Sequence, residues 1–208
     1  MMTGMPTVKD EQRAPDTRER ILAASTELFR HRGYAGTGLK AVVASSRAPY
    51  GSLYHFFPGG KEELGVAAIT SSGAMYRALV ESFYPEGVDL VVATREFFKG
   101  AAQVLEGATD YADACPIATI ALEIASTSEP MRVAASEAFE SWLAILQRRL
   151  VEAGVDDVSA REVAVELFCA MEGAFLLCRT NRSTEAMEIT GRSATRAVEA
   201  ALRAVTTR

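Results

Sequence analysis

The sequence predicts an all-α protein in which a small N-terminal three-helix unit precedes a larger helical body. Apolar residues recur at spacings of three and four positions through most of the 208-residue chain. No segment shows the sustained alternation of apolar and polar residues that is typical of a half-buried strand. Residues that favour helix starts and ends stand between the apolar runs, and they divide the chain into separate helices.

The first helix is expected to begin after Asp16. Glu19 stands three positions later, so the two residues can form a capping box. The basic run Arg30-His31-Arg32 suits the negative end of this helix, and Gly33 is suited to end it. Residues 1–14 lack both a helical pattern and the apolar segment of a secretory signal, so we expect a disordered arm there.

Residues 37–57 predict two short helices joined by a tight turn. Thr37 is expected to cap the first of them, and the turn follows at Ser45-Ser46-Arg47. Pro49 suits the first position of the next helix, where its missing N–H costs nothing. This is the layout of a helix-turn-helix, in which one helix is placed in the DNA major groove.

The rest of the chain predicts a series of longer helices. Pro58-Gly59-Gly60 interrupts the chain, and Lys61 is expected to open the fourth helix. Gly154 follows two arginines and marks a helix end, whereas Ser159 is expected to start a second capping box. The later helices are expected near residues 88–107, 115–126, 129–153, 159–179 and 184–206.

Charge is distributed unevenly along the chain. The net charge is −5, yet residues 1–60 carry eight Lys or Arg and five acids, whereas the remainder has a net charge of −8. A basic head on an acidic body can present one face to phosphate while the body is repelled. No apolar run is long enough to span a bilayer, so no membrane partner is expected.

The cysteine and histidine content argues against a disulfide scaffold and against a metal site. Three cysteines occur, the count is odd, and there is no Cys-x-x-Cys pair. The two histidines are distant in sequence from the cysteines. These features fit a reducing cytoplasm, and we expect neither a metal nor a cofactor.

Several segments of the first third resemble the DNA-binding domain of the TetR family of transcriptional repressors. They are Thr17–Phe29, Gly33-Tyr34, Gly51-Ser-Leu-Tyr-His-Phe-Phe57 and Lys61-Glu-Glu-Leu64. Two further stretches, Cys115-Pro116-Ile117-Ala118 and Ala121-Leu122-Glu123, together with Ala48-Pro49-x-Gly51-Ser52 and Pro58–Glu63, are similar to a subgroup that includes LmrA- and YxaF-like regulators.

The resemblance implies about nine helices, with residues 15–60 as the helix-turn-helix DNA-binding domain and residues 61–208 as the ligand-binding and dimerisation domain. It implies a homodimer formed through the last two long helices. It also implies a C-terminal pocket whose occupation by a small molecule releases double-stranded operator DNA. A cytoplasmic protein is expected on this basis.

The expected DNA face surrounds the second short helix. Tyr50 can touch a thymine methyl group or a phosphate, and the lack of a side chain at Gly51 permits close backbone approach, although it can also be an inconsequential helix glycine. Tyr54 and His55 resemble the phosphate-contacting pair of the family, and Arg47 replaces the usual turn glycine. The full set of expected DNA-contacting residues is Thr37, Lys40, Arg47, Pro49, Tyr50, Gly51, Ser52, Tyr54, His55 and Lys61.

Aromatic and carboxylate side chains in the apolar helices are the expected effector contacts. Glu172 can meet a cationic or hydroxylated ligand, or form a salt bridge with an arginine such as Arg95 or Arg179. Cys115 stands at a helix start, where a thiolate is favoured, so it is either a redox sensor or a packed small residue. The full set of expected effector contacts is Phe98, Cys115, Glu123, Phe139, Trp142, Glu172 and Phe175.

The last two helices carry small and apolar residues at three-to-four spacing. Such residues let helices approach closely, either in a dimer seam or against the subunit's own core. We favour the dimer seam, because a two-fold dimer explains how a small head reads a palindrome. The expected interface residues are Phe168, Met187, Gly191, Ala194, Val198 and Ala201.

The function expected from these features is that of a transcriptional repressor. It would bind a palindromic operator as a dimer and be released by a small apolar or amphipathic effector. An enzyme is not expected, because the sequence offers no Ser/His/Asp set, no paired carboxylates with a nearby base and no glycine-rich phosphate loop. The alternatives are a repressor that senses oxidants or electrophiles through Cys115, and a DNA-binding protein without regulation.

Overall fold

The computed structural model describes residues 16–108, 111 and 115–206. These residues form nine α-helices, one π-helical segment and no strand, so the predicted all-α fold is confirmed. The expected N-terminal arm, residues 1–14, lies outside the described residues. None of the described helices combines the length and the apolar composition needed to cross a bilayer.

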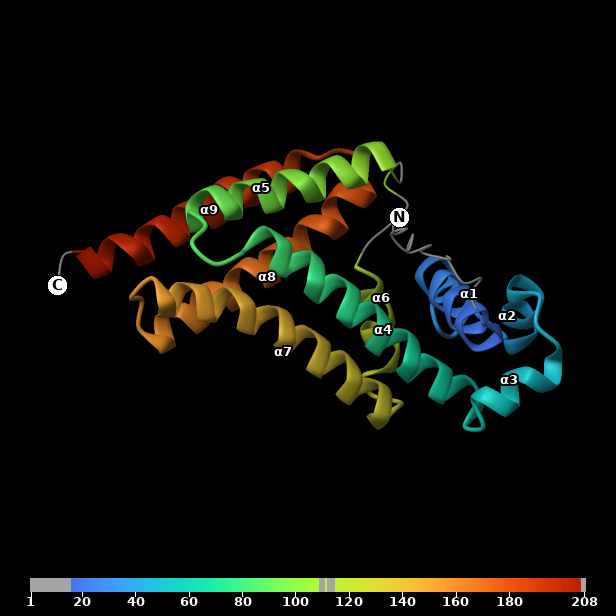
Figure 1. Cartoon of the computed structure of the whole chain (residues 1–208). Coiled ribbons are helices and arrows are strands. Elements are labelled where there is room, and N and C mark those ends of the chain that lie inside the picture. The colour runs from blue at the N-terminus through green and yellow to red at the C-terminus, as the bar shows by residue number, and fades with distance from the viewer. Residues whose placement is uncertain (1–15, 109–110, 112–114, 207–208) are drawn as a thin grey trace, which may run out of the picture.

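The first three helices form a small head at one end of the molecule (Figure 1). They are α1 (Thr17–Arg32), α2 (Leu39–Ser46) and α3 (Tyr50–Phe56). The head has its own apolar core, which consists of the fully buried side chains of Ile21, Phe29, Val42, Leu53 and Phe57. Burial of these side chains fixes the angle between α2 and α3, and therefore which side of α3 faces solvent.

The remaining helices form an elongated body. They are α4 (Gly60–Phe83), α5 (Leu90–Gln103), the π-helical segment η1 (Val104–Ala108), α6 (Pro116–Ile124), α7 (Glu129–Glu152), α8 (Asp157–Asn181) and α9 (Glu185–Thr206). Helix α4 packs along α7, while α9 lies beside both α5 and α8 (Figure 1). Short α6 lies where the body meets α1 (Figure 1).

Helices α4 and α7 approach closely at Gly73. A Cβ atom at this position would lie 2.8 Å from the Cβ of Ala138, which is too close for an ordinary contact. The indole N–H of Trp142 donates a hydrogen bond of 3.0 Å to the carbonyl of Gly73. This bond fixes the only tryptophan of the chain against α4.

The predicted start of α1 is confirmed, and α3 starts one position later than predicted. Asp16 and Glu19 form the predicted capping box, with each carboxylate accepting the other residue's backbone N–H, at 2.8 and 3.0 Å. Pro49 precedes α3 as its N-cap instead of occupying the first helical position.

Two predicted caps are wrong. Gly38 is the N-cap of α2, and the hydroxyl of Thr37 instead donates to the carbonyl of Gly33 at 2.8 Å. Asp156, not Ser159, caps α8, because its carboxylate accepts the Ser159 N–H at 3.1 Å and so starts the helix earlier.

Candidate DNA interface and effector cavity

Helix α3 presents a polar and aromatic face to solvent. Tyr50 and Tyr54 are 49% and 46% exposed, and their ring centroids are 5.9 Å apart. His55 is exposed beside them, while Leu53 anchors the opposite side of the helix in the head core. A Cβ at Gly51 would meet nothing within 4 Å, so packing inside the subunit does not require glycine there. The exposed side of α3 can therefore meet a groove without unfolding the head.

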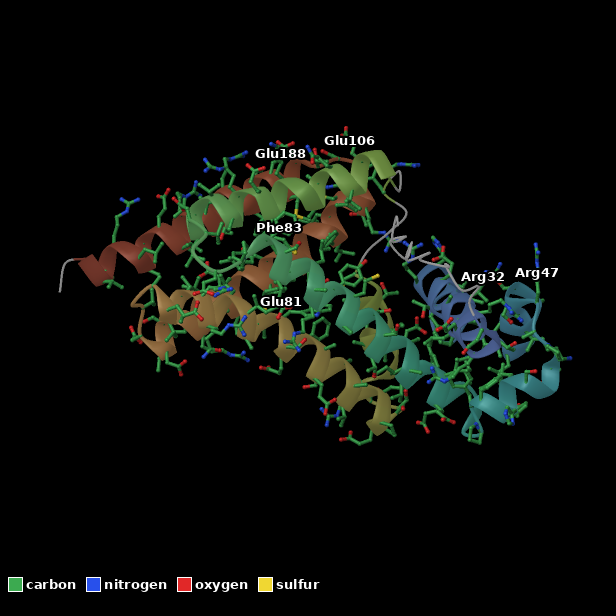
Figure 2. All side chains as sticks on the ribbon, in the orientation of Figure 1. Arg32, Arg47, Glu81, Phe83, Glu106 and Glu188 are labelled. Atoms are coloured by element: carbon green, nitrogen blue, oxygen red, sulfur yellow. The ribbon has the colours of Figure 1, made fainter. Side chains whose placement is uncertain are left out.

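Arg47 ends α2 in a left-handed conformation, with φ 51° and ψ 32°. The turn thus keeps the backbone geometry that glycine normally supplies, and the arginine bears the steric cost. Its side chain is exposed and points away from the helices of the head (Figure 2). A cation in this place is available to a phosphate.

Two substitutions at Arg47 separate backbone strain from charge. Arg47→Gly is expected to be more stable to unfolding than Arg47→Ala by about 1 kcal/mol, because only glycine relieves the left-handed strain. Both variants should lower the slope of log affinity against log salt by about one per subunit if Arg47 holds a phosphate. Denaturant unfolding and operator titrations at several salt concentrations measure the two effects. An unchanged salt slope in both variants would exclude a phosphate contact.

The structure places two expected DNA contacts at the junction between head and body. The hydroxyl of Thr37 is bonded inside the head and the residue is only 1% exposed, so its side chain offers nothing to a phosphate. The ammonium of Lys61 lies 4.3 Å from the centroid of the Tyr34 ring. Burial lowers the pKa of Lys61, and the charge of Glu123 opposes that shift. The remaining expected contacts lie in or beside α2 and α3.

Glu123 joins α6 to the head. Its carboxylate accepts the backbone N–H groups of Tyr34 and Ala35 at 3.1 and 2.7 Å, in the loop between α1 and α2. Next to this link, the hydroxyl of Ser128 donates to the carboxylate of Glu62 at 2.6 Å. The expectation that Glu123 contacts the effector is therefore wrong, because two head amides occupy its carboxylate.

An apolar cavity of about 210 Å³ lies inside the body. Its walls come from α4, α5, η1, α7 and α8, together with Cys115 at the start of α6. It is lined by Tyr76, Leu79, Val80, Phe83, Phe97, Gly100, Ala101, Val104, Leu105, Cys115, Trp142, Phe168, Met171, Glu172 and Phe175.

Four of the expected effector contacts line this cavity, namely Cys115, Trp142, Glu172 and Phe175. Phe98 does not, because it lies under the groove between α5 and α9. Phe139 packs edge-on against Trp142, with ring centroids 5.3 Å apart, and is not among the lining residues. The aromatic residues of α4 in the cavity wall, Tyr76 and Phe83, were missed, although their spacing of seven places both on one helical face.

Cys115 and Glu172 are polar neighbours in this apolar wall. Burial raises the pKa of the Glu172 carboxyl, and a hydrogen bond from the Cys115 thiol opposes the shift. Burial also raises the pKa of that thiol, and the charge of Glu172 raises it further. Cys115 is therefore held as a thiol, which does not favour its expected alternative role as a reactive sensor.

The salt bridge considered for Glu172 is not formed. The guanidinium of Arg179 donates instead to the carbonyl of Tyr111 at 3.4 Å, and Arg95 lines a different groove. Among the described residues, the Cys115 thiol is the group whose hydrogen bond affects the Glu172 carboxyl, and no cation does so. Glu172 is thus a largely buried acid without a counter-charge in the described part of the chain.

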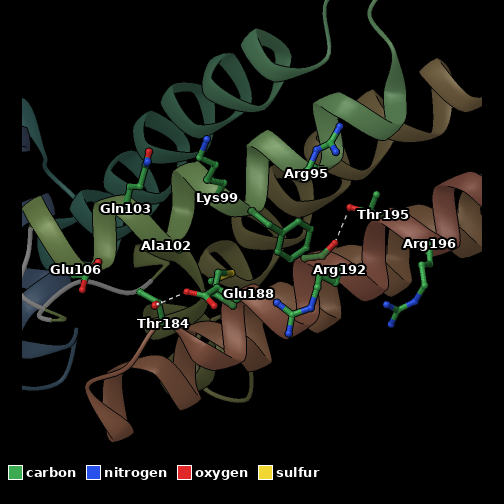
Figure 3. Close-up of a pocket in the computed structure, with 13 residues that line it drawn as sticks. Arg95, Lys99, Ala102, Gln103, Glu106, Thr184, Glu188, Arg192, Thr195 and Arg196 are labelled. Carbon is green, nitrogen blue, oxygen red and sulfur yellow. Dashed lines mark hydrogen bonds between the residues drawn. The ribbon is translucent and has the colours of Figure 1, made fainter.

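A wider groove of about 600 Å³ runs between α5 and α9 (Figure 3). Arg95 and Arg196 lie toward one end of it, and Glu106 lies toward the other (Figure 3). Its rims are charged and its floor is apolar, including Phe98. A small apolar molecule fits the inner cavity better, because that cavity removes more of its surface from water.

The expected dimer stripe on α9 packs within the subunit. Met187, Gly191, Ala194 and Val198 are buried in the single chain, and a Cβ at Gly191 would lie 2.8 Å from the Cβ of Phe98 in α5. Phe168, also expected in the seam, lines the inner cavity. The small residues thus serve close packing of α9 on α5 and α8.

A different set of residues on α8 and α9 is exposed to solvent. It contains small and apolar side chains that are exposed in the single chain, and we call it the α8–α9 face. Its residues are Cys169, Gly173, Leu176, Leu177, Ile189, Ser193 and Ala200.

Comparison with known proteins identifies the fold and the family. Residues 21–69 match the model of bacterial regulatory proteins of the tetR family, and residues 91–193 match that of the LmrA/YxaF-like transcriptional regulator C-terminal domain. The chain is 38% identical to the HTH-type transcriptional regulator YxaF of Bacillus subtilis, over 80% of this chain and 87% of YxaF. The chain belongs to the TetR family of transcriptional regulators.

Other TetR-family proteins extend this result. The HTH-type transcriptional regulator LmrA of Bacillus subtilis is 32% identical over 81% of this chain and 89% of its own. The HTH-type transcriptional repressor NemR of Escherichia coli is 28% identical over 83% of this chain and 89% of its own. The reduced form of NemR superimposes with a TM-score of 0.74 over 86% of this chain and 95% of its own. TetR-family proteins are DNA-binding regulators, not enzymes.

Proposed function

We propose that this TetR-family protein is a ligand-responsive repressor that binds a palindromic operator as a dimer. A small apolar or amphipathic effector enters the inner cavity and releases the DNA. In this proposal α1–α3 bind DNA, and the helices from α4 onward hold the effector and the partner subunit. The name of the relative NemR, a transcriptional repressor, supports repression as the direction of control. In this proposal the protein acts in the cytoplasm, where chromosomal DNA lies.

The position of helix α6 is the observation that supports the proposal most directly. One end of α6 contacts the cavity, and the other end contacts the head. Cys115 is its N-cap and lines the cavity. Glu123 stands in its last turn and holds the loop between α1 and α2 through two N–H bonds. A nine-residue helix is only about 13 Å long, so it transmits a displacement as a rigid body.

The cavity must enlarge to hold an effector of ordinary size. Its volume of about 210 Å³ is below the range of about 300–1,000 Å³ that is usual for ligand pockets. An effector larger than this volume must push lining elements apart, and the short α6 is one of them. Glu123 would then draw the α1–α2 loop with it and shift the head relative to α4. Such a shift changes the spacing of the two α3 helices in a dimer, on which operator recognition depends.

The α8–α9 face is the proposed dimer interface. Exposed leucine and isoleucine side chains lie there beside Gly173 and Ala200, which allow helices of two subunits to approach closely. A two-fold axis through this face would place the same residues of both subunits against each other. The charged groove between α5 and α9 shares no lining residue with this face.

Trp142 provides the test of effector control. A molecule that enters the cavity is expected to change its fluorescence and to weaken operator affinity about 5–150-fold, which is the usual range of coupling between sites. The variant Phe175→Ala should bind the same molecule more weakly, because Phe175 lines the cavity. The measurements are a fluorescence titration of the protein and operator titrations at several effector concentrations.

One outcome of that experiment would contradict effector control. If a broad screen yields molecules that perturb Trp142, but none changes operator affinity, effector control is wrong and only the DNA-binding half of the proposal survives. The phenylalanine variant checks that the signal comes from the cavity. A perturbation of equal strength in Phe175→Ala would place the binding molecule elsewhere.

A further inference from the structure

We propose that the effector carries a positive charge on an aromatic or otherwise apolar frame, and that Glu172 binds this charge. The inference rests on the proposed function, because it concerns the occupant of the same cavity. It specifies what the cavity selects: a lipophilic monocation, such as a substituted ammonium, in preference to a neutral or anionic molecule of the same shape.

The charges around the cavity support a cation. Glu172 is the one residue among the described lining that is ionised at neutral pH in an ordinary environment, and that described lining includes no Lys, Arg or His. An anion would therefore meet a carboxyl group and no compensating charge. A neutral apolar ligand would strip water from Glu172 and leave the carboxyl with the thiol of Cys115. A cationic effector would supply the counter-charge that the described residues do not provide.

Aromatic rings provide the second part of the site. Tyr76, Trp142, Phe168, Phe97 and Phe83 form a continuous series along the wall, in which each neighbouring pair has ring centroids between 5.2 and 6.3 Å apart. All of them line the cavity together with Glu172. The faces of such rings attract a cation when it is removed from water. An ammonium group in this cavity would therefore be stabilised by the rings as well as by the carboxylate.

The geometry of α8 explains why Glu172 is available. Met171 and Ala174 are buried in the body, and Gly173 is exposed on the α8–α9 face. Glu172 lies between these two sides of the helix and is only partly exposed. Its side chain lines the cavity instead of extending into bulk water. The helix thus places an acid where a ligand, and not solvent, becomes its neighbour.

A pair of probes that differ only in charge tests the inference. Benzyltrimethylammonium and neopentylbenzene have the same shape, with a nitrogen cation in one replaced by carbon in the other. We expect the full-length protein to bind the ammonium at least about tenfold more tightly than the hydrocarbon, by Trp142 fluorescence. Phenylacetate, the anionic control, should compete with neither. The comparison uses the wild-type protein, so it does not depend on the folding of a variant.

Glu172→Gln then assigns the preference to the carboxyl group. Glutamine keeps the size and the hydrogen-bonding capacity of glutamate but removes the charge, so the ratio between the two probes should fall by about tenfold. Equal or tighter binding of neopentylbenzene by the wild type would overturn the inference. So would an unchanged ratio in Glu172→Gln, since the rings alone would then account for it.

Operator titrations with the same probes distinguish failure of this inference from failure of the proposed function. If the ammonium binds with the expected dependence on Glu172 and operator affinity does not change, the charge preference stands and effector control fails. If neutral molecules alone release the operator, effector control stands and the cation inference is wrong. Release by the ammonium at concentrations where neopentylbenzene has no effect would support both.

Discussion

Leu176→Glu is expected to convert the protein from a dimer into a folded monomer and to weaken operator binding at least about a hundredfold. Leu176 is 64% exposed in the single chain and lies on the α8–α9 face. In a two-fold dimer the substitution appears twice, and it buries carboxylates without partners. A monomer binds one half-site only, so it loses the advantage of having the second head already in place.

Two control variants, Leu122→Glu and Ala194→Glu, make this experiment specific. Leu122 on α6 is 89% exposed and lies outside the α8–α9 face, so Leu122→Glu should remain a dimer. Ala194 is 5% exposed in the core of its own subunit, so Ala194→Glu should unfold the chain instead of dissociating an intact one. Sedimentation measures the oligomeric state, and thermal unfolding by circular dichroism measures the fold. If Leu176→Glu stays dimeric, the interface lies elsewhere.

The contrast between Ala194 and Leu176 explains what the sequence could predict about α9. The spacing of Met187, Gly191, Ala194 and Val198 correctly identifies a face that is covered. Periodicity does not tell whether the cover is another helix of the same chain or a second copy. Here Phe98 of α5 occupies the space above Gly191. Which element covers this face of α9 depends on packing between segments that are distant in the sequence. The local pattern holds no information about that packing.

Helix ends were predicted well where a local side chain decides them. The Asp16–Glu19 capping box and the ending at Gly33 depend on residues within one or two turns, and both are present. Thr37 does not cap α2, because its hydroxyl donates to carbonyl groups of α1 and of the following loop instead. A threonine next to a predicted helix start has the right chemistry for either role, and tertiary contacts chose between them.

The assignment of Glu123 failed for a similar reason. A carboxylate within an apolar helix must have a partner, and the sequence identified that need correctly. The partners are backbone N–H groups of Tyr34 and Ala35, almost 90 positions earlier in the chain. Backbone amides leave no trace in composition or spacing, so only the fold could reveal that Glu123 faces the head and Glu172 faces the cavity.

Glu123→Ala is expected to uncouple the effector from the operator. The variant removes the acceptor of two charge-assisted bonds, so α6 can move without moving the α1–α2 loop. The change in operator affinity on adding effector, about 5–150-fold in a coupled regulator, should fall to about twofold or less. Because coupling is reciprocal, operator DNA should also lose its effect on effector affinity. Fluorescence titrations of Trp142 with and without operator, and operator titrations with and without effector, measure both factors.

Two further glutamate substitutions decide whether this loss belongs to the link itself. Glu123→Gln keeps one carbonyl acceptor but no charge, so its coupling should be intermediate. Glu137→Ala removes an exposed glutamate from α7 and should retain full coupling. A structural defect alone would lower the stability of Glu123→Ala, but it would not remove the effect of each ligand on the other. If Glu123→Ala keeps the full coupling factor, the signal crosses from body to head by another route, such as the packing of α1 against α4.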